Sequence, residues 1–136
     1  MSDHDTAARP AQGRDPELSE RMRRILPLKP TWLHILLAVA GGHRHGYAIR
    51  QEVEGRTEGR VRLWPATLYG TLARLTDEGL LEEAAENPDA DDDDPRRRYY
   101  RLTAFGAEVL EAETRRLEQL VRLARSRQPL DQPGRA

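Results

Sequence analysis

Residues 66–80 carry hydroxyl and guanidinium groups at spacings that let one face of a helix donate hydrogen bonds to another molecule. Leu68, Leu72 and Leu75 are four and three residues apart, so they share one helical face and favour packing. The candidate contact residues around the rest of the helix are Thr67, Tyr69, Gly70, Thr71 and Arg74. A DNA major groove admits one α-helix and displays a distinct hydrogen-bonding pattern for each base pair. The segment therefore fits a groove-binding helix, and an ordinary surface helix is the alternative.

Two glycines are informative in this segment. Gly70 lies inside the expected helix, where glycine costs about 1 kcal/mol relative to alanine. This cost suggests close approach to another surface, with simple tolerance of a weak position as the alternative. Gly79 lies where the end of a helix favours a residue with positive φ, and the chain resumes with an expected strand over residues 80–83.

An arginine cluster follows and could neutralise phosphates or enter a minor groove. Its members are Arg96, Arg97 and Arg98. Arginine makes planar, two-pronged contacts with phosphate or guanine, and Lys29 is the only lysine of the chain. Pairing with nearby aspartates is the alternative role for the cluster, and codon usage is the alternative reason for the arginine bias.

The distribution of charge decides whether nucleic acid is a plausible partner. The formal net charge of −1 argues against one. Residues 82–94, however, hold eight of the 23 acidic residues and no basic one, which leaves 22 basic against 15 acidic residues elsewhere. Double-stranded DNA is therefore a permitted partner. The acidic loop, residues 87–95, either folds over the arginine cluster and weakens non-specific binding or is a solvated, disordered loop, and we favour the second interpretation.

Other reactive groups do not form a recognisable site. Asp89, Asp91 and Asp93 resemble the first ligands of a calcium loop, but the glycine and distal glutamate of that loop are missing. His43 and His45 could hold a metal, but their segment follows two glycines and we favour an exposed turn. His34 is expected to be a core or interface residue and not a ligand. No nucleophile–base set or glycine-rich phosphate loop is present. We therefore expect no enzyme, no metal and no cofactor.

Length and composition favour one intracellular domain. The chain has 136 residues, 38% of them hydrophobic, and no cysteine, so disulfides and thiolate zinc sites are excluded. The longest apolar run, residues 32–40, is too short to span a bilayer, and the N-terminus lacks a secretory apolar core. We expect a soluble, cytoplasmic protein without a membrane partner.

Periodicity predicts helices over residues 16–26, 32–40, 45–55 and 65–78. In the third of these, Tyr47, Ile49 and Val53 are expected to face inward, and Trp64 is expected to anchor the start of the fourth. Alternation of Tyr100 and Leu102 with arginines predicts a return strand that completes a hairpin. Thr103 can cap the helix that follows.

A last helix over residues 104–126 is longer than a small domain needs to cover its core. Its apolar stripe, together with that of helix 16–26, predicts a homodimer interface made by Leu18, Met22, Ile25, Val109, Leu110, Leu117, Leu120 and Ala124. The expected organisation is a disordered arm (1–15), a DNA-binding domain (16–102), a dimerisation helix (103–126) and a disordered tail (127–136).

Four motifs together resemble PadR-like transcriptional regulators in order and spacing: Gly46-Tyr47, Thr67-Leu68-Tyr69, Gly79-Leu80 and Arg98-Tyr99-Tyr100-Arg101-Leu102-Thr103. The resemblance covers residues 30 to 126. It implies a mainly α, winged helix-turn-helix fold with a small β-hairpin (α+β). It also implies a homodimeric repressor that binds an inverted-repeat operator and is released by a small molecule or another signal.

Two expectations qualify the resemblance. A hairpin tip with five aspartates over residues 87–95 departs from the family pattern and would repel DNA, so insertion of the wing is in question. If an effector pocket exists, we expect it at the dimer seam, lined by Trp32 and the C-terminal helix. A winged-helix module that binds protein instead of DNA is the alternative function.

Overall fold

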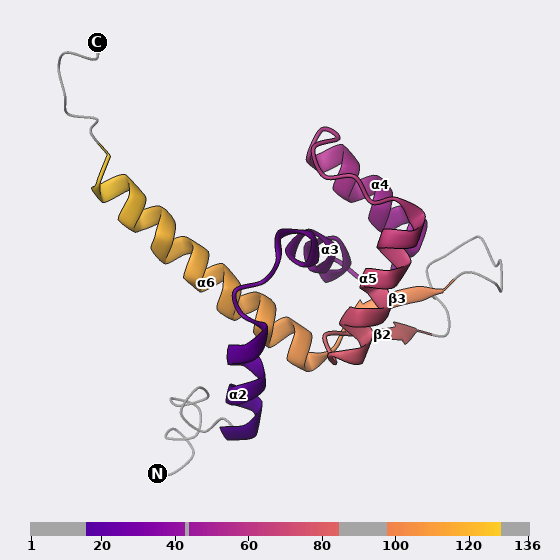
Figure 1. Ribbon diagram of the computed structural model, residues 1–136, viewed down its shortest axis with the longest axis horizontal. Coiled ribbons are helices and arrows are strands. Elements are labelled where there is room, and N and C mark those ends of the chain that lie inside the picture. The colour runs from indigo at the N-terminus through magenta and orange to yellow at the C-terminus, as the bar shows by residue number, and fades with distance from the viewer. Residues whose placement is uncertain (1–15, 43, 85–97, 129–136) are drawn as a thin grey trace.

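The protein is mainly helical, with one small antiparallel sheet (Figure 1). A computed structural model describes residues 16–42, 44–84 and 98–128. The elements are α2 (Pro16–Ile25), α3 (Pro30–Ala40), β1 (Arg44–His45), α4 (Gly46–Arg56), α5 (Pro65–Asp77), β2 (Leu81–Ala84), β3 (Tyr99–Leu102) and α6 (Ala104–Ser126). The predicted fold class is therefore confirmed. The predicted arm, the acidic loop and most of the predicted tail lie outside the described residues.

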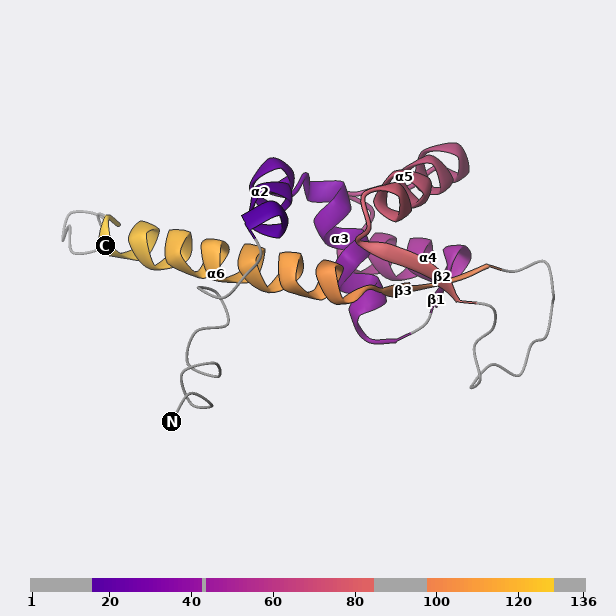
Figure 2. The ribbon, with the colours of Figure 1, turned by 90° about the horizontal axis from the view of Figure 1, so that it is seen from below.

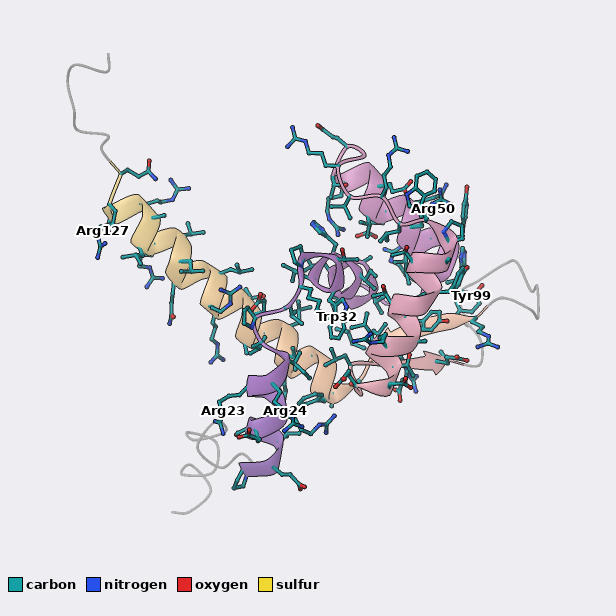
Figure 3. All side chains as sticks on the ribbon, viewed as in Figure 1. Arg23, Arg24, Trp32, Arg50, Tyr99 and Arg127 are labelled. Carbon is teal, nitrogen blue, oxygen red and sulfur yellow. The ribbon has the colours of Figure 1, made fainter. Side chains whose placement is uncertain are left out.

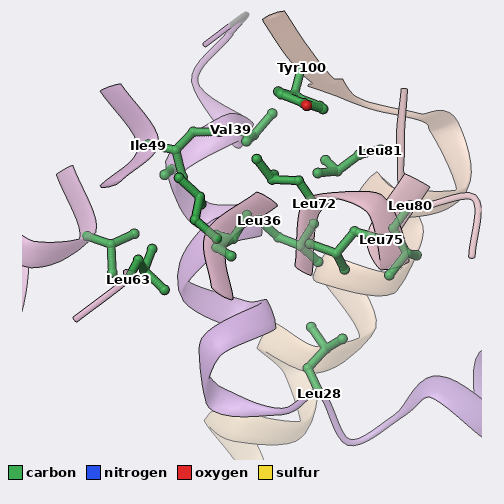
Figure 4. Packing of buried hydrophobic residues seen from close by; sticks show 14 of the residues in the cluster. Leu28, Leu36, Val39, Ile49, Leu63, Leu72, Leu75, Leu80, Leu81 and Tyr100 are labelled. Carbon is green, nitrogen blue, oxygen red and sulfur yellow. The ribbon is translucent and has the colours of Figure 1, made fainter. Parts of the chain in front are cut away.

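Helices α3, α4 and α5 pack around one apolar core (Figure 4). Ile35, Ile49 and Leu72 are fully buried at its centre. Pro30 and Pro65 begin α3 and α5, where the missing proline N–H would have had no partner inside the helix. Within the described residues, no helix has the length and apolar character needed to cross a membrane.

The sheet has the strand order β1-β3-β2. Strands β2 and β3 form the predicted hairpin, with Glu82 opposite Arg101. The exposed turn expected at residues 43–45 is wrong for Arg44 and His45, because both pair with β3. The His45 ring meets the Tyr99 ring edge-on at 5.5 Å, and His45 Nδ1 accepts a hydrogen bond from the Ala48 N–H at the start of α4.

The turn between α4 and α5 is fixed by one carboxylate. The Leu63 N–H donates to Glu54 Oε2 at 3.0 Å, and Arg50 Nε donates to the same oxygen at 3.2 Å. These contacts lower the pKa of Glu54, with the Leu63 N–H as the largest cause. The turn itself uses positive φ at Glu58 and Gly59. The direction in which α5 leaves the turn is therefore tied to α4.

The end of α5 and the start of α6 form a single joint. Gly79 has φ of 84°, as expected for a glycine that ends a helix. Thr103 Oγ1 donates to the Gly79 carbonyl and also caps α6 by accepting from the Gly106 N–H at 2.9 Å. Arg21 of α2 donates to the Glu78 carbonyl at 2.9 Å and lies over the Phe105 ring. Three helices thus meet at this joint.

Glu113 is a buried charge that ties α6 to the segment between α2 and α3. Its side chain is 1% exposed and accepts two hydrogen bonds of 2.8 Å from Arg116. The Leu28 N–H donates to Glu113 Oε2 at 3.2 Å. Together the contacts lower the pKa of Glu113 below its ordinary value of 4.5, mainly through the Arg116 hydrogen bonds.

We expect Glu113→Gln to destabilise the protein by about 1–3 kcal/mol at neutral pH, because it removes the charge that Arg116 pairs with. A carboxyl whose pKa is lowered by folding contributes stability above its unfolded pKa and loses it as the pH falls through the folded pKa. The gap in free energy of unfolding between wild type and variant should therefore close in acid. Urea unfolding at pH 7 and at about pH 3 measures it, and a gap that does not depend on pH would contradict the assignment.

Candidate nucleic-acid interface

Small, exposed side chains form a narrow line along one side of helix α5. Leu68, Leu72 and Leu75 are at most 1% exposed, as their spacing predicted. The opposite side of the helix is exposed and consists of Ala66, Gly70, Ala73 and Asp77. We call Ala66, Gly70 and Ala73 the ridge. The α5 backbone can therefore approach another molecule closely along this line.

The protomer itself does not require a glycine at position 70. A Cβ built on Gly70 meets no heavy atom within 4 Å among the described residues. Glycine is unfavourable in an exposed helix by about 1 kcal/mol relative to alanine. The described residues therefore give no packing reason for a glycine at this position.

One hollow of about 650 Å³ lies between α5, the start of α4 and the hairpin. We call it the wing hollow. Tyr69 lines it and is 49% exposed, and its hydroxyl would lie 2.7 Å from a Cβ on Gly46. Gly46 therefore provides the space in which the Tyr69 ring lies. Tyr47 also lines the hollow.

Two aromatic residues were predicted in the wrong environment. Tyr47 is 56% exposed, because Gly46, Ile49 and Val53 share the buried face of α4 and Tyr47 lies on another side. The Tyr47 hydroxyl accepts a hydrogen bond from Gln51, one turn further along. Trp64 is 58% exposed and therefore does not anchor the start of α5.

The hairpin side of the wing hollow contains both signs of charge. Arg98 is paired with Glu83 at 3.1 Å, although its side chain is 68% exposed. Asp77 and Glu83 both line the hollow. Burial, followed by the nearby Glu83 carboxylate, raises the pKa of Tyr100. Arg98 Nη1 therefore already has a partner in the protomer, and a phosphate at that nitrogen would compete with Glu83. Arg96 and Arg97 lie outside the described residues.

A second hollow, of about 410 Å³, lies on the other side of α5. We call it the α3 hollow. The start of α3 contributes Lys29 and Trp32, and α5 contributes Thr67, Thr71 and Arg74 along with part of the ridge. Figure 3 shows Trp32 between α3 and α5. The predicted contact residues of α5 are thus split, with Tyr69 in the wing hollow and the others at the α3 hollow.

A third hollow of about 570 Å³ separates α3 from the second half of α6. We call it the α3–α6 groove. Its apolar lining residues are Leu33, Leu37, Leu117 and Val121. Trp32 is not among the described residues that line this groove, so within the protomer Trp32 and the C-terminal helix line separate hollows. The pocket expected at the dimer seam stays a prediction. Adjacent side chains on α3 point to different sides of the helix, which separates Trp32 from Leu33.

Two residues expected at a dimer interface lie inside the protomer. Met22 is 8% exposed and Val109 is fully buried, and both belong to the core. The first turns of α6 use the apolar stripe to cover that core, whereas residues 118–128 are exposed. Leu120, Val121 and Leu123 of this exposed part are 47%, 51% and 47% exposed.

Sequence reasoning missed Tyr47 and Lys29 as members of the candidate interface. For Lys29 a signal was present, because the only lysine of the chain directly precedes the proline that begins α3. Among the described residues, no group of three or more histidine or acidic residues could hold a metal ion. Hydrogen-bond donors, aromatic rings and cations on either side of an exposed helix are the features of a nucleic-acid surface.

Residues 35–112, more than half of the chain, match the transcriptional regulator PadR-like family. The chain belongs to the PadR-like family. PadR-like proteins are transcriptional regulators and not enzymes, so the expectation of a non-enzymatic regulator is confirmed. PadR-like regulators bind DNA and typically act as dimers. The exposed α5 and the hairpin are therefore the winged helix-turn-helix elements of a PadR-like protein.

Individual proteins are similar to this chain in sequence or in fold. Transcriptional regulator Rv3488 of Mycobacterium tuberculosis is 38% identical over 90 residues, which cover 66% of this chain and 78% of Rv3488. The 37.1 kDa protein in transposon TN4556 of Streptomyces fradiae is 38% identical over 86 residues, which cover 63% of this chain and only 22% of that protein. A solved PadR-like regulator from Bacillus cereus shares the fold with a TM-score of 0.59 at 20% identity, over 79% of this chain and 94% of the other.

Proposed function

We propose that this PadR-like protein is a cytoplasmic, homodimeric, sequence-specific repressor. It binds an inverted-repeat operator in double-stranded DNA. The observation that carries the proposal is the exposed α5 ridge, with open space beyond Gly70 and a hollow on each side. In this proposal the ridge enters the major groove, and Thr67, Thr71 and Arg74 contact bases or phosphates. Tyr69 and Arg98 contact the backbone on the hairpin side.

Exposed apolar residues on α6 support the dimer. The second half of α6 extends beyond the rest of the protomer (Figures 1 and 2). An isolated helical segment of this length is marginal in water, so it requires a packing partner. We assign that role to α6 of a second subunit, through Leu117, Leu120, Val121 and Ala124. In this organisation residues 16–102 bind DNA and residues 103–126 join the subunits.

The α3–α6 groove is the best candidate for an effector site. Its lining combines Leu33, Leu37 and Val121 with Arg122 and Arg125. Apolar clefts between helices with a few polar groups are common ligand sites. A ligand in this groove would change how α6 packs on the body, and this change would relieve repression. We therefore propose the α3–α6 groove, and not the surroundings of Trp32, as the effector site.

The decisive experiment measures binding of the purified protein to DNA upstream of its own coding sequence by fluorescence anisotropy at two salt concentrations. We expect Arg74→Ala to weaken binding by about 1–3 kcal/mol if Arg74 contacts a base, and Thr71→Ala to weaken it less. Arg24→Ala is the matched control, since it removes an exposed arginine on α2 that lines neither hollow (Figure 3).

If Arg74→Ala and Arg24→Ala weakened DNA binding equally, α5 would not be part of the DNA interface. Absence of binding to this DNA and to a genomic fragment library at low salt would reject the DNA function. Binding of a protein partner that is insensitive to salt would then favour the interaction-module alternative.

The dimer proposal predicts that Val121→Asp converts the protein to a monomer with little change in the protomer fold. Val121 is 51% exposed in the protomer, so a carboxylate there is solvated until a second α6 covers it. Light scattering coupled to size-exclusion chromatography measures the mass. Gln119→Asp adds the same charge on an exposed, more polar side of α6 and should stay dimeric. A monomeric wild type, or a dimeric Val121→Asp, would contradict the interface.

A further inference from the structure

The two hollows beside α5 differ in charge. The wing hollow contains the carboxylates of Asp77 and Glu83 and one arginine, Arg98, which is already paired. In the α3 hollow the charged lining residues are Lys29 and Arg74, and no carboxylate of the described chain lines it. Among the described residues, the lining of the α3 hollow therefore carries net positive charge.

Lys29 is held in place by its neighbours on both sides. Its backbone has φ of −63° and ψ of 144°, and Pro30 restricts the residue before it to such extended conformations. The Lys29 ammonium lies 5.2 Å from the centre of the Trp32 ring. A cation over an aromatic face is attracted to it and gives up part of its rotamer freedom. The charge is therefore already directed toward the hollow without an ion pair to a described carboxylate.

We propose that Lys29, supported by the Trp32 ring, binds a backbone phosphate of the DNA strand that borders the major groove on the α3 side. The inference rests on the proposed function and extends it to a residue outside the helix-turn-helix. Because the ridge is narrow and made of small side chains, both walls of a groove about 12 Å wide come close to the flanks of α5. The DNA strand on the α3 side therefore comes closest to Lys29 and Arg74.

A compact ammonium suits this role. Lysine binds phosphate as a point charge, without the two-pronged geometry that reads a base edge. The contact therefore contributes to affinity and positions the protein along the duplex, but it confers no sequence preference. Trp32 has a positioning role, because it orients the ammonium and does not itself contact the phosphate. It is half-buried, so part of its side chain is exposed and can be covered by a DNA strand.

The salt dependence of operator binding tests the inference. Each neutralised phosphate contributes about 0.9 to the slope of log K against log salt. A homodimer contains two Lys29 residues, so Lys29→Gln should lower the slope by roughly 1.8 and weaken binding at 0.1 M salt by roughly 60-fold. The loss should be equal on operator and unrelated DNA, Lys29→Arg should keep the slope, and the melting temperature should not change.

Three results are decisive. An unchanged slope in Lys29→Gln, with binding still weakened by Arg74→Ala, would overturn the Lys29 contact and leave the proposed function standing. An equal loss of slope in the control Arg24→Gln would also overturn it, because the effect would then be one of net charge. Failure of the wild type to bind any DNA would overturn both the inference and the proposed function.

Tryptophan accessibility gives an independent readout. The chain has two tryptophans, so Trp64→Phe leaves Trp32 as the only one. Quenching of Trp32 by acrylamide should decrease when DNA is bound, because the strand at Lys29 covers the α3 hollow. The same decrease should be absent when DNA is added at 1 M salt, where phosphate contacts are lost. Unchanged quenching in a saturated low-salt complex would show that the hollow stays open and would overturn the assignment.

Discussion

A leucine at position 70 is expected to remove most of the specific DNA affinity and to leave the fold intact. A Cβ at Gly70 meets no heavy atom within 4 Å among the described residues, and the position is exposed, so a leucine side chain can extend into solvent. If the ridge enters a major groove, the same side chain holds α5 away from the bases. Specific DNA affinity commonly exceeds non-specific affinity by about 10³-fold or more. We expect Gly70→Leu to lower the specific affinity by roughly 100-fold.

Paired measurements on two glycines test this expectation. Gly55 is also exposed in a helix, and a Cβ built on it meets no heavy atom within 4 Å among the described residues. Gly55→Leu on α4 should therefore bind DNA as the wild type does, and both leucine variants should melt at or above the wild-type temperature. Normal operator affinity in Gly70→Leu would show that the ridge does not dock closely.

The second large effect is expected from Gly106→Ala, which should destabilise the protein by about 3 kcal/mol or more. A Cβ on Gly106 would overlap the Leu80 carbonyl oxygen and lie 2.9 Å from the Leu80 carbonyl carbon. Both atoms belong to the backbone of the α5–α6 joint, so no side-chain rotation relieves the clash. The joint would have to open, and its Thr103 hydrogen bonds would weaken.

Thermal unfolding followed by circular dichroism measures this effect. For about a hundred ordered residues, 3 kcal/mol corresponds to a fall in melting temperature of more than about 10 °C. Gly55→Ala makes the same chemical change without a clash and should raise the melting temperature slightly. Similar small shifts in the two variants would contradict the close contact between α6 and Leu80.

Local signals in the sequence were sufficient for the helices and the hairpin. Pro65 marks the start of α5, the spacing of its leucines marks the buried face, and Gly79 marks the end. The cap at Thr103 likewise located α6. These features depend on residues within one or two turns of each other, which is why periodicity and capping chemistry predict them.

Long-range contacts explain what the sequence did not reveal. Arg44 and His45 form a strand only because β3 is next to them, and two residues are too few to show alternation. The burial of Glu113 depends on Leu28, 85 residues away. Similarly, the helical spacing of α5 identified an outward side but could not show that Tyr69 and Arg74 belong to hollows on opposite flanks.

Because hydrogen bonds of Thr103 fix the start of α6 to the end of α5, the two helices move together when α6 tilts. With 23 residues at 1.5 Å each, α6 is about 35 Å long, and its far half is the part assigned to the second subunit. A tilt of about 5° at that far end moves the joint by about 3 Å, close to the 3.4 Å rise of one base pair. A small repacking between subunits would thus shift each recognition helix by one step along its operator, which is enough to place it on the wrong bases.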